Sequence, residues 1–335
     1  MRCLRFLAAL SLAPLLHAAP DAIVAADGSG NYTTPQAAVD AAPAGLTNPW
    51  VIAIKPGRYR GHLAIPATKP WLTLRGEDAT TTVITDDRNL NSPGVDGAKI
   101  TTPDSATAHI QANNFTAENV TFENTTTLDQ HIQALALYMT GDRAVFRRCR
   151  FLGWQDTLRA DSPRAAGVTE PDAPRPAGTA RQYYVDCYIE GHVDFIYAAA
   201  TAVFERCHIH AKADGYLTAA STPQAAPFGY VFIDCKVTTG PDVKNGVYLG
   251  RPWRQFAATA FIRTELAGDI RPEGWHNWGK ASHEQTARYV EYASTGPGAK
   301  PTERVKWAKV LTDEEAKAYT AEKILAGSDG WNPKR

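Results

Sequence analysis

The feature that most constrains the fold is a short pattern that recurs in the middle of the chain. Each copy alternates apolar and polar residues, as a β-strand does, around an asparagine or a cysteine. The five copies occupy residues 115–122, 146–151, 184–189, 204–209 and 232–237. Asn119 of the first copy and the cysteines of the four later copies follow one another at spacings of 30, 38, 20 and 28 residues. Repeats of this length indicate a solenoid.

The segments between the copies indicate which kind of solenoid forms. They are rich in Gly, Pro, Thr and Asp and lack the 3.6-residue period of a helix, so helical crossovers are not expected. We therefore predict an all-β fold of stacked parallel coils, a parallel β-helix, with 51–54 and 71–74 supplying earlier strands. A β-sandwich remains the alternative on strand count alone.

Two segments are suited to cover the ends of such a stack, where strand groups would otherwise stay unpaired. Residues 34–42 begin with a threonine followed by a proline, a common start for a helix. Residues 312–319 begin with a capping-box pattern. Short capping helices are predicted at both ends.

Length and charge limit the organisation and the partners. The chain has 335 residues, and its internal repetition favours one large domain. Lys plus Arg and Asp plus Glu both number 35, so the formal net charge is zero. A nucleic-acid binder would be expected to carry a basic surface, so nucleic acid is not expected as a partner.

The first residues are typical of a secretory signal peptide. Two arginines precede an apolar run at 6–16, and small residues follow at 18 and 19. The run is too short for a membrane anchor. We predict a signal peptide at 1–19, a single catalytic domain at 20–335, and an exported protein, secreted or periplasmic.

Export makes a disulfide plausible among the four cysteines of the domain. A bridge between Cys187 and Cys207 is the candidate, and stacked interior thiols that act as small hydrophobic residues are the alternative. No Cys-x-x-Cys pair is present, so zinc is not expected.

One segment interrupts the repeat. Residues 161–181 contain four prolines and many alanines, which resist regular structure, and we expect a long surface loop there.

Two aspartates occupy the same position of the repeated unit. Asp156 lies seven residues after Cys149, and Asp194 lies seven residues after Cys187. Because neighbouring coils stack at about 4.8 Å, the two carboxylates are expected to meet. Two close carboxylates do not both ionise readily, so one can serve as an acid while the other serves as a nucleophile or base. Asp214 and Asp242 share this offset, which leaves ordinary turn aspartates as the alternative.

Three other side chains complete a hydrolase site. Arg251 can hold the ionised carboxylate through two hydrogen bonds. Gln155 and Gln133 offer amide donors to a developing oxyanion.

These residues lie in segments that resemble pectin methylesterases. The segments that carry the resemblance most strongly are 133–137, 153–157, 194–197 and 249–253. Further similar segments lie at 26–32, 105–107, 216–220, 272–275 and 296–298. The resemblance covers nearly the whole of the expected mature chain. It implies a single-stranded right-handed parallel β-helix like that of the pectin lyases.

The resemblance also implies a role for each site residue. Asp194 would attack the methyl ester carbonyl of a galacturonate, Asp156 would act as the general acid and base, and Arg251 would orient Asp194. Gln155 would stabilise the oxyanion, and Gln133 would line the same site. It implies substrate contacts for Trp253 and Thr102. Phe195, Trp154 and Arg159 are further candidate substrate-binding residues in the same segments.

The chain departs from the family pattern at two places beside these aspartates. Arg159 stands where a tyrosine often occurs, and we expect it to favour a demethylated sugar nearby. The family's Phe-Gly pair is replaced by Tyr197 and Ala198. Ala198 adds a methyl group at the position of the family's glycine, so we expect this change to affect the local backbone geometry rather than the chemistry.

The sequence thus predicts a monomeric pectin methylesterase that needs no metal or other cofactor and acts on methyl-esterified homogalacturonan. A pectinolytic glycosidase or lyase on the same fold is one alternative, because paired carboxylates also hydrolyse glycosides. A non-catalytic polysaccharide-binding solenoid and an esterase for smaller acyl esters are the others.

Overall fold

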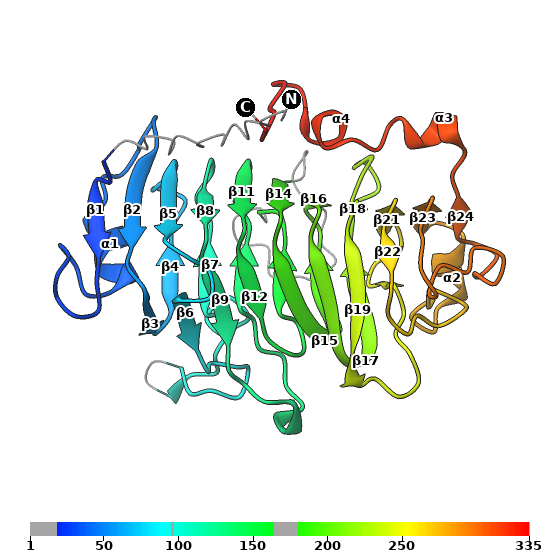
Figure 1. Cartoon of the computed structure of the whole chain (residues 1–335), viewed down its shortest axis with the longest axis horizontal. Coiled ribbons are helices and arrows are strands. Elements are labelled where there is room, and N and C mark those ends of the chain that lie inside the picture. The colour runs from blue at the N-terminus through cyan, green and yellow to red at the C-terminus, as the bar shows by residue number, and fades with distance from the viewer. Residues whose placement is uncertain (1–18, 95–96, 164–179, 335) are drawn as a thin grey trace, which may run out of the picture.

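In a computed structural model, the chain is described over residues 19–94, 97–163 and 180–334. The coils follow one another along a single long axis, from β1 at one end to β24 at the other (Figure 1). Across the described ranges, no helix is long and apolar enough to cross a membrane. The predicted signal peptide lies outside these ranges except for residue 19.

One side of the stack is an eleven-stranded parallel sheet. In spatial order its strands are β1 (Ala22–Val24), β2 (Trp50–Ile54), β5 (Leu72–Gly76), β8 (Thr116–Glu118), β11 (Ala144–Arg147), β14 (Arg181–Val185), β16 (Thr201–Glu205), β18 (Tyr230–Ile233), β21 (Ala258–Ile262), β23 (Arg288–Tyr292) and β24 (Lys309–Val310). Each strand begins a new coil.

The remaining strands form two further rows that join where single strands run through both. The second row contains β3 (Gly57–Arg60), β6 (Thr82–Asp86), β9 (Thr121–Asn124), β12 (Arg150–Leu152), β15 (Tyr188–Ala198), β17 (His208–Ala220), β19 (Lys236–Asp242) and β22 (Glu265–Leu266). The third row contains β4 (Leu63–Ile65), β7 (Ala108–Ile110), β10 (Leu137–Met139), β13 (Leu158–Ala160), the ends of β15 and β17, and β20 (Arg251–Pro252). The predicted parallel β-helix is confirmed, and the sandwich is excluded.

A repeated turn separates the first row of strands from the second. Its central residue has a positive φ in successive coils, for example 54° at Asp186 and 52° at Arg206. The backbone N–H of Asp186 donates to Glu205 O at 3.1 Å, and the Arg206 guanidinium pairs with the Asp186 carboxylate at 2.8 Å. Arg263 and Asp234 repeat this pairing at 2.7 Å.

Arg263 belongs to a sixth copy of the repeat that the sequence analysis missed. In this copy Thr264 takes the place of the cysteine, so the pattern is not visible from the cysteines alone.

Aromatic rings form a stack inside the coils at the spacing of the strands. Successive ring centres lie 4.8, 4.7, 4.6 and 4.5 Å apart along Phe146, Tyr184, Phe204, Phe232 and Phe261. The planes are nearly parallel, with tilts of 4 to 13°. The strand spacing therefore sets the ring spacing.

The predicted disulfide between Cys187 and Cys207 is wrong. Both thiols, like those of Cys149 and Cys235, are free and buried. Each sulfur faces a carbonyl of the preceding coil, as when Cys187 Sγ lies 3.5 Å from Phe146 O. Side chains that project in parallel from stacked coils stay about one strand spacing apart, farther than the ~3.8 Å between the Cβ atoms of a disulfide. The alternative of stacked interior thiols is the correct one.

The N-terminal helix α1 (Pro35–Ala41) forms where it was predicted. Thr34 caps it by accepting the N–H of Ala37 at 3.2 Å, and the helix packs against β1, β2 and β4.

The C-terminal helices differ from the prediction in length and place. The predicted capping box at Thr312 is present, but α3 (Asp313–Ala316) is shorter than expected. A second helix, α4 (Ala321–Leu325), packs on the outer face of the first sheet against β14 and β16, instead of closing the end of the stack. Figure 1 shows this segment running back along the side of the coils. A one-turn helix, α2 (Ala281–Glu284), was not predicted.

The predicted surface loop at 161–181 begins and ends in the protein interior. Asp161, Ser162 and Ala180 are buried, and Ser162 Oγ accepts the N–H of Ala180 at 2.9 Å. Arg181 already belongs to β14. The rest of the predicted loop, 164–179, lies outside the described residues.

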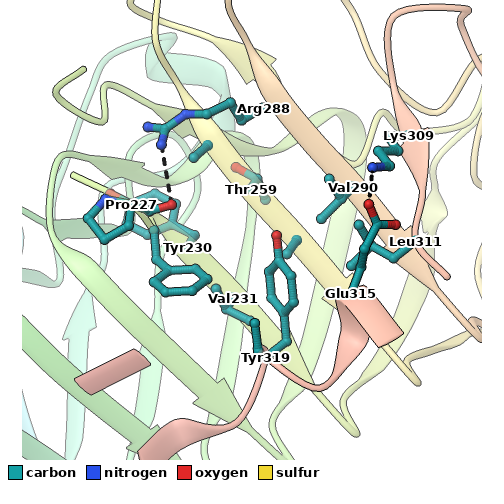
Figure 2. A pocket seen from close by; sticks show the side chains of 15 residues that line it. Pro227, Tyr230, Val231, Thr259, Arg288, Val290, Lys309, Leu311, Glu315 and Tyr319 are labelled. Carbon is teal, nitrogen blue, oxygen red and sulfur yellow. Dashed lines mark hydrogen bonds and ion pairs between the residues drawn. The ribbon is translucent and has the colours of Figure 1, made fainter. Parts of the chain in front are cut away.

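The C-terminal segment leaves a groove of about 450 Å³ over the first sheet (Figure 2). Tyr230 and Val290 form its floor, and Tyr319 borders it. Arg288 donates to Pro227 O at 3.2 Å, and Lys309 pairs with Glu315. The strands under this groove, β18 and β23, do not carry Asp156 or Asp194.

The aromatic stack predicts the effect of removing one of its rings. Phe204 is fully buried between Tyr184 and Phe232, so Phe204→Ala leaves a cavity and should lower the free energy of unfolding by about 3–5 kcal/mol. Denaturant unfolding measures the change, and Val310→Ala, at a 51% exposed position, is the control. A loss below about 1 kcal/mol would show that the stack is not tightly packed.

Candidate active site

Asp156 and Asp194 lie on neighbouring coils, as the repeat predicted. The N–H of Asp156 donates to Val193 O at 3.2 Å. Two residues further along, Leu158 of β13 pairs with Ile196 of β15. Both aspartates have a positive φ, 65° and 52°, a conformation that aspartate tolerates better than most residues.

Arg251 holds Asp194 through two hydrogen bonds, as predicted. Its Nε donates to Oδ1 at 2.8 Å, and its Nη2 donates to Oδ2 at 2.7 Å. The guanidinium lies between two aromatic rings, 3.8 Å from the centre of Tyr216 and 3.8 Å from that of Trp278. Such a planar, stacked arrangement fixes the arginine and therefore the carboxylate.

Gly250 allows the strand that carries Arg251 to approach β17. A Cβ atom at this position would come within 2.0 Å of Thr218 Oγ1. The close approach pairs Arg251 with Ala219 on the neighbouring coil.

The surroundings of the two aspartates shift the pKa values of their carboxyl groups differently. Burial, followed by the nearby charge of Asp194, raises the pKa of Asp156 to about 8. Asp156 keeps an exposed edge, although protein atoms surround most of its carboxyl group. Burial also raises the pKa of Asp194, but the hydrogen bonds and charge of Arg251 oppose this shift. At neutral pH, Asp156 can therefore hold a proton while Asp194 is ionised.

The two glutamines lie on consecutive coils beside the aspartates. The N–H of Ala134, which follows Gln133, donates to the carbonyl of Gln155 at 3.2 Å. Both glutamines keep a partly exposed surface. The structure thus brings Gln133, Gln155, Asp156 and Asp194 to one region of the outer face.

Three of the predicted substrate-binding residues are partly exposed. Trp253 packs on Tyr197 with ring centres 5.9 Å apart. Trp154 lies under the Lys212 ammonium, 3.7 Å from the centre of its ring. Thr102 lies in a loop, where its carbonyl accepts a hydrogen bond from Ser105 at 2.9 Å.

Phe195 and Arg159 do not have the roles predicted for them. Phe195 points into the core and is fully buried, so the predicted contact with substrate is wrong. Successive side chains of a strand point to opposite sides, so the residue that follows the outward-facing Asp194 points inward. Arg159 is 7% exposed and is paired with the fully buried Asp161 at 3.0 Å. It does not present an unpaired charge to a demethylated sugar.

Comparison with known proteins shows the family. A sequence profile described as Pectinesterase matches residues 21–166 and 176–328. Pectinesterase 31 of Arabidopsis thaliana is 39% identical over 298 residues, which cover 88% of both chains. The chain belongs to the pectinesterase family. Its members are carboxylic ester hydrolases, which confirms the predicted reaction class.

Solved structures of this family share the fold. A pectin methylesterase from carrot matches with a TM-score of 0.82 and 33% identity, over 93% of this chain and 95% of that one. PemA from Erwinia chrysanthemi matches with a TM-score of 0.78 and 29% identity, over 95% and 99%. A pectinesterase/pectinesterase inhibitor of Solanum lycopersicum is 37% identical, but this chain covers only 51% of its length.

Three aromatic residues of the pectinesterase site had no role in the sequence analysis. Tyr216 and Trp278 enclose Arg251, and Tyr197 lies beneath Trp253. Tyr216 lies in a family-like segment, which is a signal that could have identified it. Trp278 lies in none of the matching segments.

The structure also distinguishes the paired aspartates from Asp214, which shares their position in the repeat. Asp214 accepts backbone N–H groups from Lys244 at 2.8 Å and Asn245 at 2.9 Å. Although burial acts to raise it, these hydrogen bonds lower the pKa of Asp214. Asp214 lies within β17 and holds the backbone of the next coil at residues 244 and 245, so it does not belong to the carboxylate pair.

The raised pKa of Asp156 predicts how stability depends on pH. The unfolded carboxyl titrates near 3.8 and the folded one near 8, so the unfolded state ionises first and stability falls as pH rises through this window. Asp156→Asn removes this loss. Unfolding experiments should show a stabilisation that is small at pH 4 and largest at pH 8.

Asp214→Asn is the matched control, with the opposite sign. It removes a carboxylate whose pKa is lowered, so it should destabilise at neutral pH, by an amount that shrinks on acidification. An Asp156→Asn effect that does not vary with pH would contradict the assigned proton affinity.

Proposed function

We propose that this pectinesterase hydrolyses the methyl esters of homogalacturonan to free carboxylates and methanol, with Asp194 as the nucleophile. The observation that carries the proposal is that the two aspartates differ in their hydrogen bonds and in the pKa of their carboxyl groups. Arg251 holds one carboxylate in two hydrogen bonds, and burial raises the pKa of the other to about 8. This is the arrangement required of a nucleophile and an acid at neutral pH.

In the first step, a carboxylate oxygen of Asp194 attacks the ester carbonyl. The carbonyl π electrons move to its oxygen, where the amides of Gln155 and Gln133 donate to the oxyanion. When the carbonyl re-forms, the bond to the methoxy oxygen breaks, and Asp156 supplies the proton that makes methanol. The products are methanol and an acyl-enzyme in which the Asp194 carboxyl is joined to the galacturonate as an anhydride.

In the second step, Asp156 is a carboxylate and acts as the general base. It takes a proton from water, whose oxygen attacks the galacturonate carbonyl of the anhydride. The bond to Asp194 breaks, and the nucleophile returns as a carboxylate held by Arg251. Asp156 regains its proton, so both groups are ready for the next ester.

The proposed substrate is a polymer, and the protein is proposed to meet it outside the cytoplasm as a monomer. A solenoid offers an extended surface to a long chain. One solved relative is a pectin methylesterase in complex with a hexasaccharide, which matches with a TM-score of 0.78. If residues 1–19 are a signal peptide, the exported protein should begin near residue 20, and an exported form that retains Met1 would exclude this cleavage.

Methanol release from highly methylated pectin tests the activity. The wild type should release methanol without new reducing ends or unsaturated uronates, and Asp194→Asn should lower the rate by at least about a thousandfold because the nucleophile is lost. Bond cleavage without methanol would identify a glycosidase or lyase. No product from the polymer would favour a binding protein or an esterase for smaller esters.

A further inference from the structure

A ladder of planar side chains runs along the third row of strands, separate from the main core. His109, Tyr138, Arg159 and Tyr197 occupy equivalent positions of β7, β10, β13 and β15. The rings of His109 and Tyr138 are stacked, with centres 4.7 Å apart and a tilt of 12°. The central carbon of Arg159 lies 4.6 Å from the ring centre of Tyr138 and 5.3 Å from that of Tyr197. A guanidinium therefore takes the place of a ring in this ladder.

Trp253 reaches the end of the ladder from a later coil. It follows β20, whose Arg251 is in register with Ala219 of β17, and Ala219 is in register with Tyr197. Ala219 has only a methyl group, which leaves room for the indole to pack on Tyr197, with ring centres 5.9 Å apart. The Trp253 ring centre also lies 5.9 Å from the central carbon of Arg159. The indole thus meets groups of two earlier coils.

A buried carboxylate holds Arg159 in this position. Its Nε and Nη2 both donate to Oδ2 of Asp161 at 3.0 Å, and the Asp161 side chain is fully buried. A buried ion pair seldom adds stability relative to apolar residues, because both charges lose their hydration. What this pair provides is a guanidinium of fixed orientation within about 6 Å of three aromatic rings, the range in which a cation attracts the face of a ring.

Arg254 also lies near the indole, but it cannot anchor the ring to another coil. Its central carbon is 4.6 Å from the Trp253 ring centre, and its Nη1 donates to the carbonyl of Trp253 at 3.0 Å. Because it is the next residue in the chain, it joins the indole only to its own loop. Arg159 belongs to β13 and joins the indole to the body of the solenoid.

We propose that Arg159 is a positioning residue for Trp253, which it holds, together with Tyr197, at the angle at which the indole packs on a galacturonate of the substrate. This inference rests on the proposed esterase function and on the substrate contact predicted for Trp253. An indole that is fixed before the polymer arrives binds more tightly, because ordering a free side chain during binding lowers affinity. Loss of Arg159 should therefore weaken binding without slowing the chemical step.

Arg159→Lys tests the proposal, because it keeps a positive charge beside Asp161 and removes the planar group that reaches the rings. KM for methanol release from methylated pectin should rise about 3–10-fold, with kcat unchanged. The Kd of unmethylated hexagalacturonate, measured by calorimetry, should rise by the same factor, and this readout does not depend on turnover. Unchanged KM and Kd in a folded variant would overturn the proposal.

Arg304→Lys is the matched control, because Arg304 belongs to another buried ion pair. It pairs with Glu291 at 2.7 Å and donates to the carbonyls of Pro272 and Gly298, none of which belongs to the site. Both lysine substitutions should lower the free energy of unfolding, but Arg304→Lys should leave KM and Kd unchanged. A similar rise of KM in both variants would indicate a general loosening of the fold and would overturn the proposal.

Trp253→Ala separates an effect that acts through the indole from an independent effect of Arg159. In this background, Arg159→Lys should change kcat/KM by less than about twofold, because the group that it positions is gone. An undiminished effect without the indole would overturn the proposal.

Two further comparisons keep the test decisive. If Arg159→Lys does not fold, the double variant Arg159→Met with Asp161→Asn takes its place, because it leaves no buried charge unpaired. The same rise of KM and Kd is expected from it. A wild type that binds hexagalacturonate but releases no methanol, with weaker binding in the variant, would reject the esterase function and keep the role of Arg159.

Discussion

The parallel register between coils is the constraint on which the rest of the structure depends. Each strand pairs with its equivalent on the next coil, so residues at one repeat position meet at about the strand spacing. Inside, this register gives the aromatic stack through Phe204. Outside, it places Asp156 beside Asp194 and Arg159 beside Tyr197. Packing and chemistry therefore follow from one geometric rule.

The same register explains what the sequence could predict. Strand periodicity and cysteine spacing were sufficient for the parallel β-helix, and a shared repeat position was sufficient to pair the two aspartates. The register also shows why the disulfide was wrong, because the stacked thiols of Cys187 and Cys207 each face a carbonyl of the preceding coil. The sixth repeat was missed because Thr264 replaces the cysteine.

The rest of the site depends on local geometry that a single sequence does not display. Phe195 points into the core because its neighbour Asp194 points outward to the site, and the short motif alone did not show which of the two faces outward. Trp278 reaches Arg251 from a distant loop without any repeat relationship. Arg159 looked like a free charge in the sequence, and only the structure shows its buried partner Asp161. The direction and the partner of each side chain were thus the least predictable part, whether the partner was near in the chain or distant.

The central claim is that Asp194 forms a covalent bond with the substrate, and trapping this intermediate tests it most directly. Methylated oligogalacturonate would be mixed rapidly with the wild-type enzyme in the presence of hydroxylamine, and the protein and the sugar would be analysed by mass spectrometry. An anhydride at Asp194 predicts a hydroxamate on that residue or on the released galacturonate, formed at the rate of methanol release. Methanol release with no hydroxamate on either product would contradict the account and indicate direct attack by water.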